Sequence, residues 1–451
     1  MRSILAGLIV LLGATKPFSQ ASPPARSSVT VFVGVNVVPM DRDRVLRNQT
    51  VVIEDGKISS IGAPLPMPSG AAVVDGHGTA FLSPGLADMH SHSDSAEDLV
   101  VYLANGVTTI LNVGGARSGF VARTRVKANR GEIPGPHVYV SFRVDGTPQY
   151  GEFIVTTPEE ARSLLRLAKT NGYDFIKVYN NLSSACFYAL IEEGRIPHVP
   201  IIGHGVTQVG LERQLAAGQV LVAHTEEFLY TFFSIPRSDQ SQAPPGVDQI
   251  PHAIDVIRRS GAFVTADLNT YATIARQWGN PPVVAEFMHM PEVRYLSPSW
   301  RVSWQSEDYQ KRKGSLSERE AFLETFTKAM ADAGIPLVVG TDAPSIPGLV
   351  PGFSVHRDLE GLQRAGLTRY QVLSTATRIP GEFIRKTLPD ADSFGTIAVG
   401  NRADLVLAAS NPLEDLLTLQ KPLGVMAHGH WYTAADLQSL LDGVASKYAM
   451  H

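Results

Sequence analysis

Two histidines one residue apart, His90 and His92, end a short apolar run that begins at Phe81. Side chains of a strand alternate between its two faces, so residues one apart at the end of a strand point the same way. Two imidazoles on one face can hold a divalent metal ion. An isolated His-x-His motif is short and also occurs on ordinary surfaces. The case for a metal centre therefore depends on what other strand ends supply.

Three more side chains that bind metals follow apolar runs directly. His204 follows PIIG, His224 follows VLVA, and Asp342 follows PLVVGT. Imidazoles and a carboxylate at several strand ends favour zinc or another borderline divalent metal, provided that the fold brings these ends together. The remaining histidines of the 13 in the chain do not end such a strand.

Lys177 lies inside the apolar segment DFIKVY, which is predicted to be a buried strand. A buried lysine is costly unless its charge is removed or paired. A neutral amine in a metal site can capture carbon dioxide to form a carbamate, whose two oxygens can bridge two cations. The alternative is an ordinary ion pair with Asp174 or with a carboxylate at the rim. The sequence leaves both interpretations open.

The segment 81–386 alternates strand and helix patterns, which predicts parallel strands. The predicted strands are 81–89, 107–113, 137–143, 174–179, 200–204, 220–224, 262–267 and 336–341. Eight strands in this length match a (β/α)8 TIM barrel, an α/β fold whose active sites form at the C-terminal ends of the strands. That fold would bring the four histidines and Asp342 to one rim.

Two outer segments, 29–80 and 394–432, carry short strand patterns and turn signals. Their similar length and turn content predict one small β-sandwich satellite domain built from both ends of the chain. A second His-x-His pair, His428 and His430, falls in the later segment. Because this pair lies off the barrel rim, we do not expect it to bind a metal.

Two connections of the predicted barrel, 225–261 and 268–334, are too long for plain crossovers, and their aromatic content argues against disorder. We expect them to form walls over the active site, with packing against the outer helices as the alternative. The aromatic residues in question are Phe228, Tyr230, Phe232, Phe233, Trp278, Tyr295, Trp300 and Trp304.

Residues 1–21 combine a basic Arg2, an apolar run and small residues suited to cleavage, which is the pattern of a secretory signal peptide. The apolar run is shorter than a membrane span requires, although a tethered N-terminus is the alternative. The mature protein is expected to be periplasmic or secreted, with no stable membrane span. A net charge of -4 offers no basic face for nucleic acid, so the expected partner is a small molecule. The sequence leaves a homo-oligomer open.

The chain resembles a known family in several motifs at once. HSH follows the first barrel strand, a lysine lies in the fourth, single histidines end the fifth and sixth, and GTDAP ends the eighth. This set resembles the metal-dependent amidohydrolase superfamily, and most closely its prolidase-like and imidazolonepropionase-related branch. SVHRDLEGLQRAGLT, ATRIPGEF and GTIAVGNRADLVLAASNPLED extend the likeness over nearly the whole mature chain.

The resemblance implies a hydrolase with two divalent metal ions, for which zinc is the expected metal. It implies that the more buried metal is held by His90, His92 and Asp342. The more exposed metal would then be held by His204 and His224, and a carbamate on Lys177 would bridge the two. A hydroxide between the metals would attack the substrate carbonyl. Asp342 would be the catalytic base and then the acid toward the leaving nitrogen. Candidates for substrate binding are Tyr179, Tyr230, His289 and His356.

The leading hypothesis is an exported hydrolase of amide bonds in N-acyl amino acids, dipeptides or similar small molecules with an aromatic part. Val-Tyr-Asn-Asn after Lys177 and an alanine before His224 depart from the family's dipeptide-cleaving members and argue against a simple dipeptidase. One alternative is a mononuclear imidazolonepropionase-like cyclic-amide hydrolase or deaminase, which would not need Lys177. A lactonase or phosphotriesterase also fits, because the same hydroxide can attack esters. A catalytically dead binding protein is disfavoured by the complete set of ligands.

Overall fold

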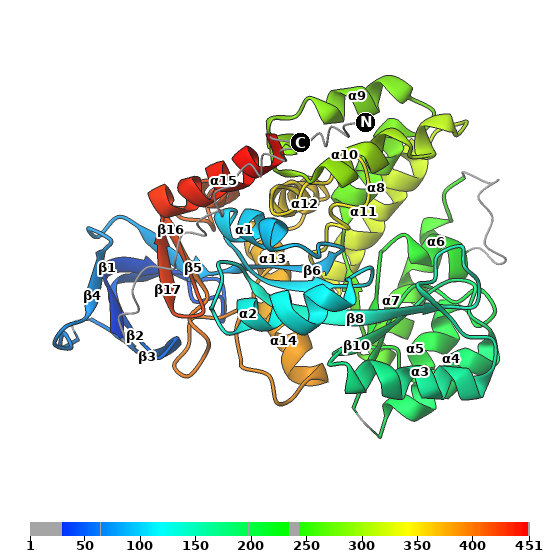
Figure 1. Cartoon of the computed structure of the whole chain (residues 1–451), viewed down its shortest axis with the longest axis horizontal. Coiled ribbons are helices and arrows are strands. Elements are labelled where there is room, and N and C mark those ends of the chain that lie inside the picture. Colours follow the sequence, from blue (N-terminus) through cyan, green and yellow to red (C-terminus); the bar gives the residue numbers. More distant parts are fainter. Residues whose placement is uncertain (1–28, 64, 197, 234–242, 450–451) are drawn as a thin grey trace, which may run out of the picture.

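The computed structural model describes residues 29–63, 65–196, 198–233 and 243–449. A satellite sheet and a larger α/β barrel lie side by side, with the first and last strands of the chain together in the satellite (Figure 1). The predicted signal segment, residues 1–21, lies outside the described residues. Within the described ranges no helix is long and apolar enough to cross a bilayer.

Eight parallel strands follow one another around the barrel, each hydrogen-bonded to the next. They are β6 (Leu86–Ser91), β7 (Val107–Asn112), β8 (His137–Asp145), β10 (Phe175–Val178), β11 (Ile201–Gly203), β12 (Leu221–Val222), β13 (Phe263–Thr265) and β14 (Leu337–Val338). The short β9 (Phe153–Ile154) pairs only with β8. The predicted (β/α)8 barrel is therefore confirmed, and every strand lies within or beside its predicted range.

The barrel closes between β6 and β14 through the residues that follow β14. Thr341 N and Asp342 N donate to His90 O at 3.0 and 2.7 Å. The buried Asp88 carboxylate accepts from Thr341 Oγ1 at 2.5 Å and from Thr341 N at 3.1 Å. A Cβ at Gly340 would lie 2.5 Å from His90 Cβ, so only glycine allows this approach. The ends of the first and eighth strands, which carry His90 and Asp342, are thereby held together.

Helices cover the outside of the barrel. They are α1 (Ala96–Ala104), η1 (Phe120–Thr124), α2 (Arg125–Asn129), α3 (Pro158–Thr170), α4 (Ser184–Gly194), α5 (Leu211–Ala217), α6 (Glu227–Thr231), η2 (Val247–Gln249), α7 (Ile250–Ser260), α8 (Leu268–Gln277), α9 (Pro281–Met288), η3 (Pro291–Tyr295), α10 (Pro298–Gln305), η4 (Tyr309–Lys311), α11 (Ser317–Asp332), α12 (Phe353–Arg364), α13 (Arg369–Thr375) and α14 (Arg378–Thr387). α3 shows how the sequence sets them: Thr157 and Glu160 form a capping box, and Pro158 stands in the first turn. Its buried residues, Ala161, Leu165 and Ala168, recur at helical spacing and face the core.

The predicted first strand, 81–89, is divided between two sheets. Phe81–Pro84 forms β5 and pairs with the satellite, and Leu86–Ser91 forms β6 of the barrel. The break falls at Gly85, whose N–H donates to Asp404 O at 2.8 Å. A Cβ on Gly85 would lie 2.2 Å from Thr108 Oγ1. The uninterrupted apolar run concealed this division, because both halves are buried.

Hydrogen bonds join the satellite strands into one sheet with the order β17-β16-β15-β5-β1-β2-β3 and β4 paired to β1. The strands are β1 (Val29–Val37), β2 (Leu46–Glu54), β3 (Lys57–Gly62), β4 (Ala72–Asp75), β15 (Leu405–Ala408), β16 (Gly424–Ala427) and β17 (His430–Thr433), with η5 (Leu416–Gln420) between β15 and β16. The two outer segments therefore build one sheet, and its apolar core includes Phe32, Leu82, Leu405 and Met426.

The chain ends in a helix that the sequence analysis did not predict. α15 (Ala434–Ala449) leaves β17 and runs back along the barrel to α1 (Figure 1). Val444 and Tyr448 pack with Val101 of α1 and Tyr295 of η3. Lys447 Nζ forms an ion pair with Glu97 on the same helix α1. The C-terminal helix thus reaches the rim where the metal-binding strand ends lie.

The two long connections serve different purposes. In the first, Phe228 and Phe233 pack against Phe326 of α11, with ring centroids 5.1 and 5.4 Å from it. Its ordered aromatics therefore belong to the outer helical layer, which was the alternative expectation. The second connection carries Trp300 and Tyr309, and both line the cavity at the barrel rim. Of the four aromatic residues predicted in this connection, only Trp300 lines the cavity; Trp278, Tyr295 and Trp304 pack in apolar clusters, which was the alternative expectation.

Candidate metal centre

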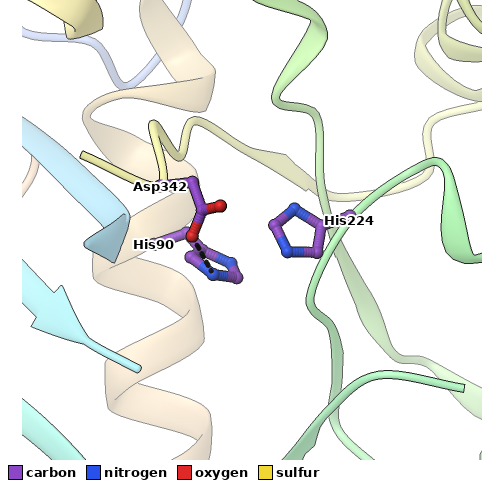
Figure 2. A group of neighbouring side chains, drawn as sticks. All are labelled: His90, His224 and Asp342. Atoms are coloured by element: carbon purple, nitrogen blue, oxygen red, sulfur yellow. Dashed lines mark ion pairs between the residues drawn. The ribbon is translucent and has the colours of Figure 1, made fainter. Parts of the chain in front are cut away.

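The predicted metal-binding residues of the first and eighth strands meet at the rim. Asp342 Oδ1 lies 3.2 Å from His90 Nε2 and 2.9 Å from His92 Nε2. Figure 2 shows His224 facing His90 and Asp342 across a short gap. The ring centroids of His90 and His224 are 4.2 Å apart. In the described part of the chain, His90, His224 and Asp342 form one group whose ligand atoms lie within 4.8 Å of one another.

That group joins residues that the sequence analysis divided between two metals. His90 and Asp342 were expected on the more buried ion, and His224 on the more exposed one. The rings are close enough for either division, so the allotment of ligands between the two ions remains a prediction.

His90 and His92 are both oriented through their Nδ1 atoms. His90 Nδ1 lies 2.9 Å from Ala223 O, and His92 Nδ1 lies 2.7 Å from Gly114 O. A carbonyl oxygen only accepts, so each Nδ1 carries the proton and each Nε2 keeps its lone pair. These lone pairs point toward the Asp342 carboxylate, so that both rings and the carboxylate could bind one metal ion. Burial lowers the pKa of His90 well below its usual value, which keeps the ring neutral.

His224 is held by a carboxylate that the sequence analysis did not assign. Its Nδ1 contacts the carboxylate of Asp267, which lies two residues after the end of β13. Burial lowers the pKa of His224, but the negative charge of Asp267 outweighs burial and raises the pKa to about 9. Surroundings that favour a proton on this ring also favour a metal cation at its Nε2 atom.

His204 is buried beside the carboxylate of Glu227. Its Nδ1 lies 2.8 Å from Glu227 Oε1, and its Nε2 forms no hydrogen bond within the described residues. Burial lowers the pKa of His204 to about 3, although the charge of Glu227 opposes this. A buried ring nitrogen without a hydrogen bond is costly unless something else binds it. A metal ion is the ligand that suits a neutral imidazole in this place.

Lys177 lies among the same residues, with Nζ 3.2 Å from His90 Nε2. The side chain is 1% exposed, and burial lowers its pKa to about 7. The alternative ion pair with Asp174 is wrong, because Asp174 pairs with Arg125 at 3.5 Å on the outer side of the barrel. A large fraction of Lys177 is therefore the neutral amine near neutral pH, which is the form that reacts with carbon dioxide.

The four residues predicted to bind substrate lie in different places. Tyr179 lines the cavity and stacks on His204, with ring centroids 3.8 Å apart. Tyr230 packs against the hydrophobic core from α6, His289 is exposed at the end of α9, and His356 is buried within α12. Only Tyr179 is among the cavity-lining residues. A role in substrate binding remains a prediction for all four.

A cavity of about 730 Å³ opens above the metal-binding residues. Its size suits a small organic molecule. Besides His92, Lys177, His204, His224 and Asp342, its lining contains acidic, basic and aromatic side chains: Asp94, Glu97, Asp98, Arg117, Arg143, Tyr150, Tyr179, Trp300, Glu307, Tyr309 and Tyr448. Tyr448 comes from α15, and Trp300 and Tyr309 come from the second long connection. Both segments therefore contribute to the cavity wall.

The sequence analysis missed the carboxylates that orient the histidines. Asp267 follows the seventh strand, so the rule that selected Asp342 would also have selected Asp267. Glu227 comes three residues after His224 at the start of α6 and carries no such signal. Arg143, in the third strand, was likewise not considered. Its role depends on which residues face it, and those are distant in sequence.

Comparisons with known proteins agree with this architecture. No family model matches the chain. Ochratoxinase of Aspergillus niger is 20% identical over 468 residues, covering 91% of this chain and 87% of that protein. Bottromycin amidohydrolase superposes with a TM-score of 0.73 at 23% identity, covering 97% of this chain and 95% of the other. A putative prolidase from Bifidobacterium longum gives a TM-score of 0.66 at 23% identity, covering 92% and 99%.

The chain has the fold of the prolidase-like amidohydrolases. The resemblance predicted from the motifs is therefore confirmed at the level of the fold. In this amidohydrolase fold the side chains at the barrel rim fit divalent metal ions on two observations. The buried Nε2 of His204 forms no hydrogen bond within the described residues. All four histidines have their Nδ1 atoms beside a carbonyl or carboxylate oxygen, which leaves Nε2 for a metal.

Proposed function

We propose that this protein is an exported, metal-dependent amidohydrolase that cleaves amide bonds of small molecules such as N-acyl amino acids and non-classical peptides. The observation that carries the proposal is the convergence of imidazoles, an amine and a carboxylate at one rim of the barrel, centred on His90, His224 and Asp342. The relatives support the same class of reaction, since their names describe an ochratoxinase, a bottromycin amidohydrolase and a prolidase. Export rests on the sequence of residues 1–21.

Two divalent ions, with zinc as the expected metal, would be held by His90, His92, His204, His224, Asp342 and a carbamate on Lys177. When bound, such ions lower the pKa of a coordinated water and polarise a carbonyl. The carbamate would form when the neutral Lys177 amine attacks carbon dioxide, making a new N–C bond and releasing a proton. Burial of Lys177 favours this reaction, because it lowers the pKa of the amine to about 7.

Asp342 is the residue that would move the proton. Burial raises the pKa of its carboxyl, but the contacts with His92 and His90 outweigh burial and hold the pKa well below its usual value. The carboxylate is therefore ionised at neutral pH and can accept a proton from the attacking water. It lies at the cavity wall, where it can return that proton to the leaving nitrogen of the amide. His90 and His92 beside it would serve as metal ligands through their Nε2 atoms.

The experiment that tests the proposal compares Lys177→Ala with the wild type. We expect about two divalent ions per chain in the wild type and close to one in the variant, measured by elemental analysis after metal loading. Amide hydrolysis should be lost in Lys177→Ala and partly restored by acetate, whose carboxylate can replace the carbamate. Lys169→Ala, on the surface of α3, is the matched control and should behave as the wild type.

Full activity of Lys177→Ala with an unchanged metal content would overturn the two-metal mechanism. One ion per chain in the active wild type would instead favour the mononuclear cyclic-amide hydrolase or deaminase.

A further inference from the structure

Arg143 lies beside the metal centre on the neighbouring strand. In the parallel pairing of β8 with β10, Arg143 is the register partner of Lys177. Paired residues of adjacent strands point to the same face, and the strands are about 4.8 Å apart. Lys177 points into the barrel toward His90, so Arg143 rises from the same interior face. Both side chains line the cavity.

The guanidinium of Arg143 has no strong partner in the described part of the chain. Its one ion-pair contact joins Nε to Glu152 Oε2 at 3.8 Å, which is too long for a hydrogen bond. That carboxylate oxygen already accepts from Gly115 N at 2.9 Å. The Nε atom of Arg143 is buried and forms no hydrogen bond. An arginine whose donors are left unused at a ligand cavity is prepared for an anion that enters it.

The other basic residues of the cavity are already engaged. Arg117 is 74% exposed and forms hydrogen bonds with Asp94 through Nε at 2.6 Å and Nη2 at 3.2 Å. Lys177 belongs to the proposed metal centre. The side chain of Arg143 is 25% exposed. The backbone of Gly114 packs closely against it, since a Cβ at Gly114 would lie 2.8 Å from Arg143 Cβ. The backbone thus holds this arginine close to the reacting centre.

We propose that Arg143 binds a carboxylate of the substrate, attached to the carbon that bears the scissile amide nitrogen. The inference rests on the proposed amidohydrolase function and deepens it: the substrates are N-acyl amino acids or peptides with a free C-terminal carboxylate. Arg143 and Lys177 are paired on adjacent strands about 4.8 Å apart, a spacing that fits an α-carboxylate and a scissile carbonyl in one small molecule. The planar guanidinium donates two parallel hydrogen bonds to a carboxylate.

The acidic residues of the cavity disfavour a ligand that carries more than one negative charge. Asp94, Glu97, Asp98 and Glu307 line the cavity, so a dianion such as a phosphate would meet more repulsion than a carboxylate. The apolar part of the substrate has aromatic surface to contact, including Tyr150, which stacks on Tyr179 with ring centroids 4.9 Å apart.

The test compares two amides that differ only in the carboxylate: N-acetyl-L-phenylalanine and N-acetylphenethylamine. We expect the metal-loaded wild type to prefer the acid in kcat/KM by roughly 10- to 100-fold, which corresponds to one or two charge-assisted hydrogen bonds. Arg143→Gln should lose this preference through a higher KM for the acid, with a much smaller loss on the neutral amide. Arg143→Lys should show an intermediate preference for the acid, because lysine keeps the positive charge but cannot donate two parallel hydrogen bonds. Arg162→Gln on α3 is the matched control.

The outcomes separate this inference from the proposed function. Hydrolysis of the neutral amide with no preference for the acid would support an amidohydrolase and overturn the role of Arg143. Equal losses of Arg143→Gln on both amides would also overturn it, since they indicate a structural effect. If neither amide is hydrolysed, calorimetric binding of N-acetyl-L-phenylalanine decides: tenfold weaker binding in Arg143→Gln supports the carboxylate site, and equal or undetectable binding to both proteins refutes it.

Discussion

The chain contains two His-x-His pairs, and the structure places them in opposite surroundings. His90 and His92 end the first barrel strand, where both Nε2 atoms lie near the Asp342 carboxylate. His428 and His430 lie in the satellite sheet, His428 in the turn after β16 and His430 at the start of β17. The two motifs are equally short in sequence, so any difference between them comes from what surrounds them.

The second pair lacks the partners that make the first a candidate metal centre. His428 stands in a turn with a φ of 52° and faces His137, with ring centroids 5.8 Å apart. Burial lowers its pKa to about 4, although Asp404 opposes this. The described part of the chain brings no set of three ligand atoms together there, whereas it does so at His90. Candidate metal ligands therefore converge where parallel strands end at one rim, and a His-x-His motif alone does not bring them together.

The largest effect is expected from exchanging histidine for glutamine in each pair. His90→Gln should lose bound metal and nearly all amide hydrolysis, because His90 contacts both Asp342 and Lys177. His428→Gln should retain the metal content and turnover of the wild type. Elemental analysis and initial rates on the purified variants measure both. The comparison would fail if His428→Gln lost metal while His90→Gln kept it.

A second, smaller effect concerns the Asp342 carboxylate, which contacts both rings of the first pair. Asp342→Asn keeps one coordinating oxygen but cannot accept a proton. We therefore expect metal binding to survive largely while kcat falls by a factor of about 10² to 10⁴. Excess metal should not restore this loss, whereas His204→Ala should partly recover under the same conditions. Recovery of Asp342→Asn to wild-type turnover would show that Asp342 is a ligand only.

The smallest effect is expected where a carboxylate acts through a histidine. Asp267→Asn removes the charge that orients His224 while keeping the size of the side chain. Loss of such a partner weakens metal binding by about 10- to 100-fold. A competition titration with a chelator measures the affinity, and saturating metal should bring activity most of the way back. An unchanged affinity would show that position, without charge, suffices to hold His224.

Much of the fold and most of the site could be predicted from the sequence for a local reason. Strand side chains alternate with a period of two, and parallel strands all end at the same edge. An apolar run that ends in a histidine or aspartate therefore places that side chain at the rim, as for His90, His204 and Asp342. Lys177 was found by the same logic, because a charged residue inside an apolar strand needs an explanation.

The tertiary structure alone decided what depends on contacts between distant segments. Gly85 divides one apolar run between two sheets because Thr108 of the next strand leaves no room for a side chain. Aromatic residues of two similar connections went to different places: Phe228 and Phe233 of the first pack against α11, whereas Trp300 of the second lines the cavity. The orientation of His224 by Asp267 and the unused donors of Arg143 also arise from residues that only the closed barrel brings together. Local patterns fix where a side chain starts, but its partners are set by how the strands close around it.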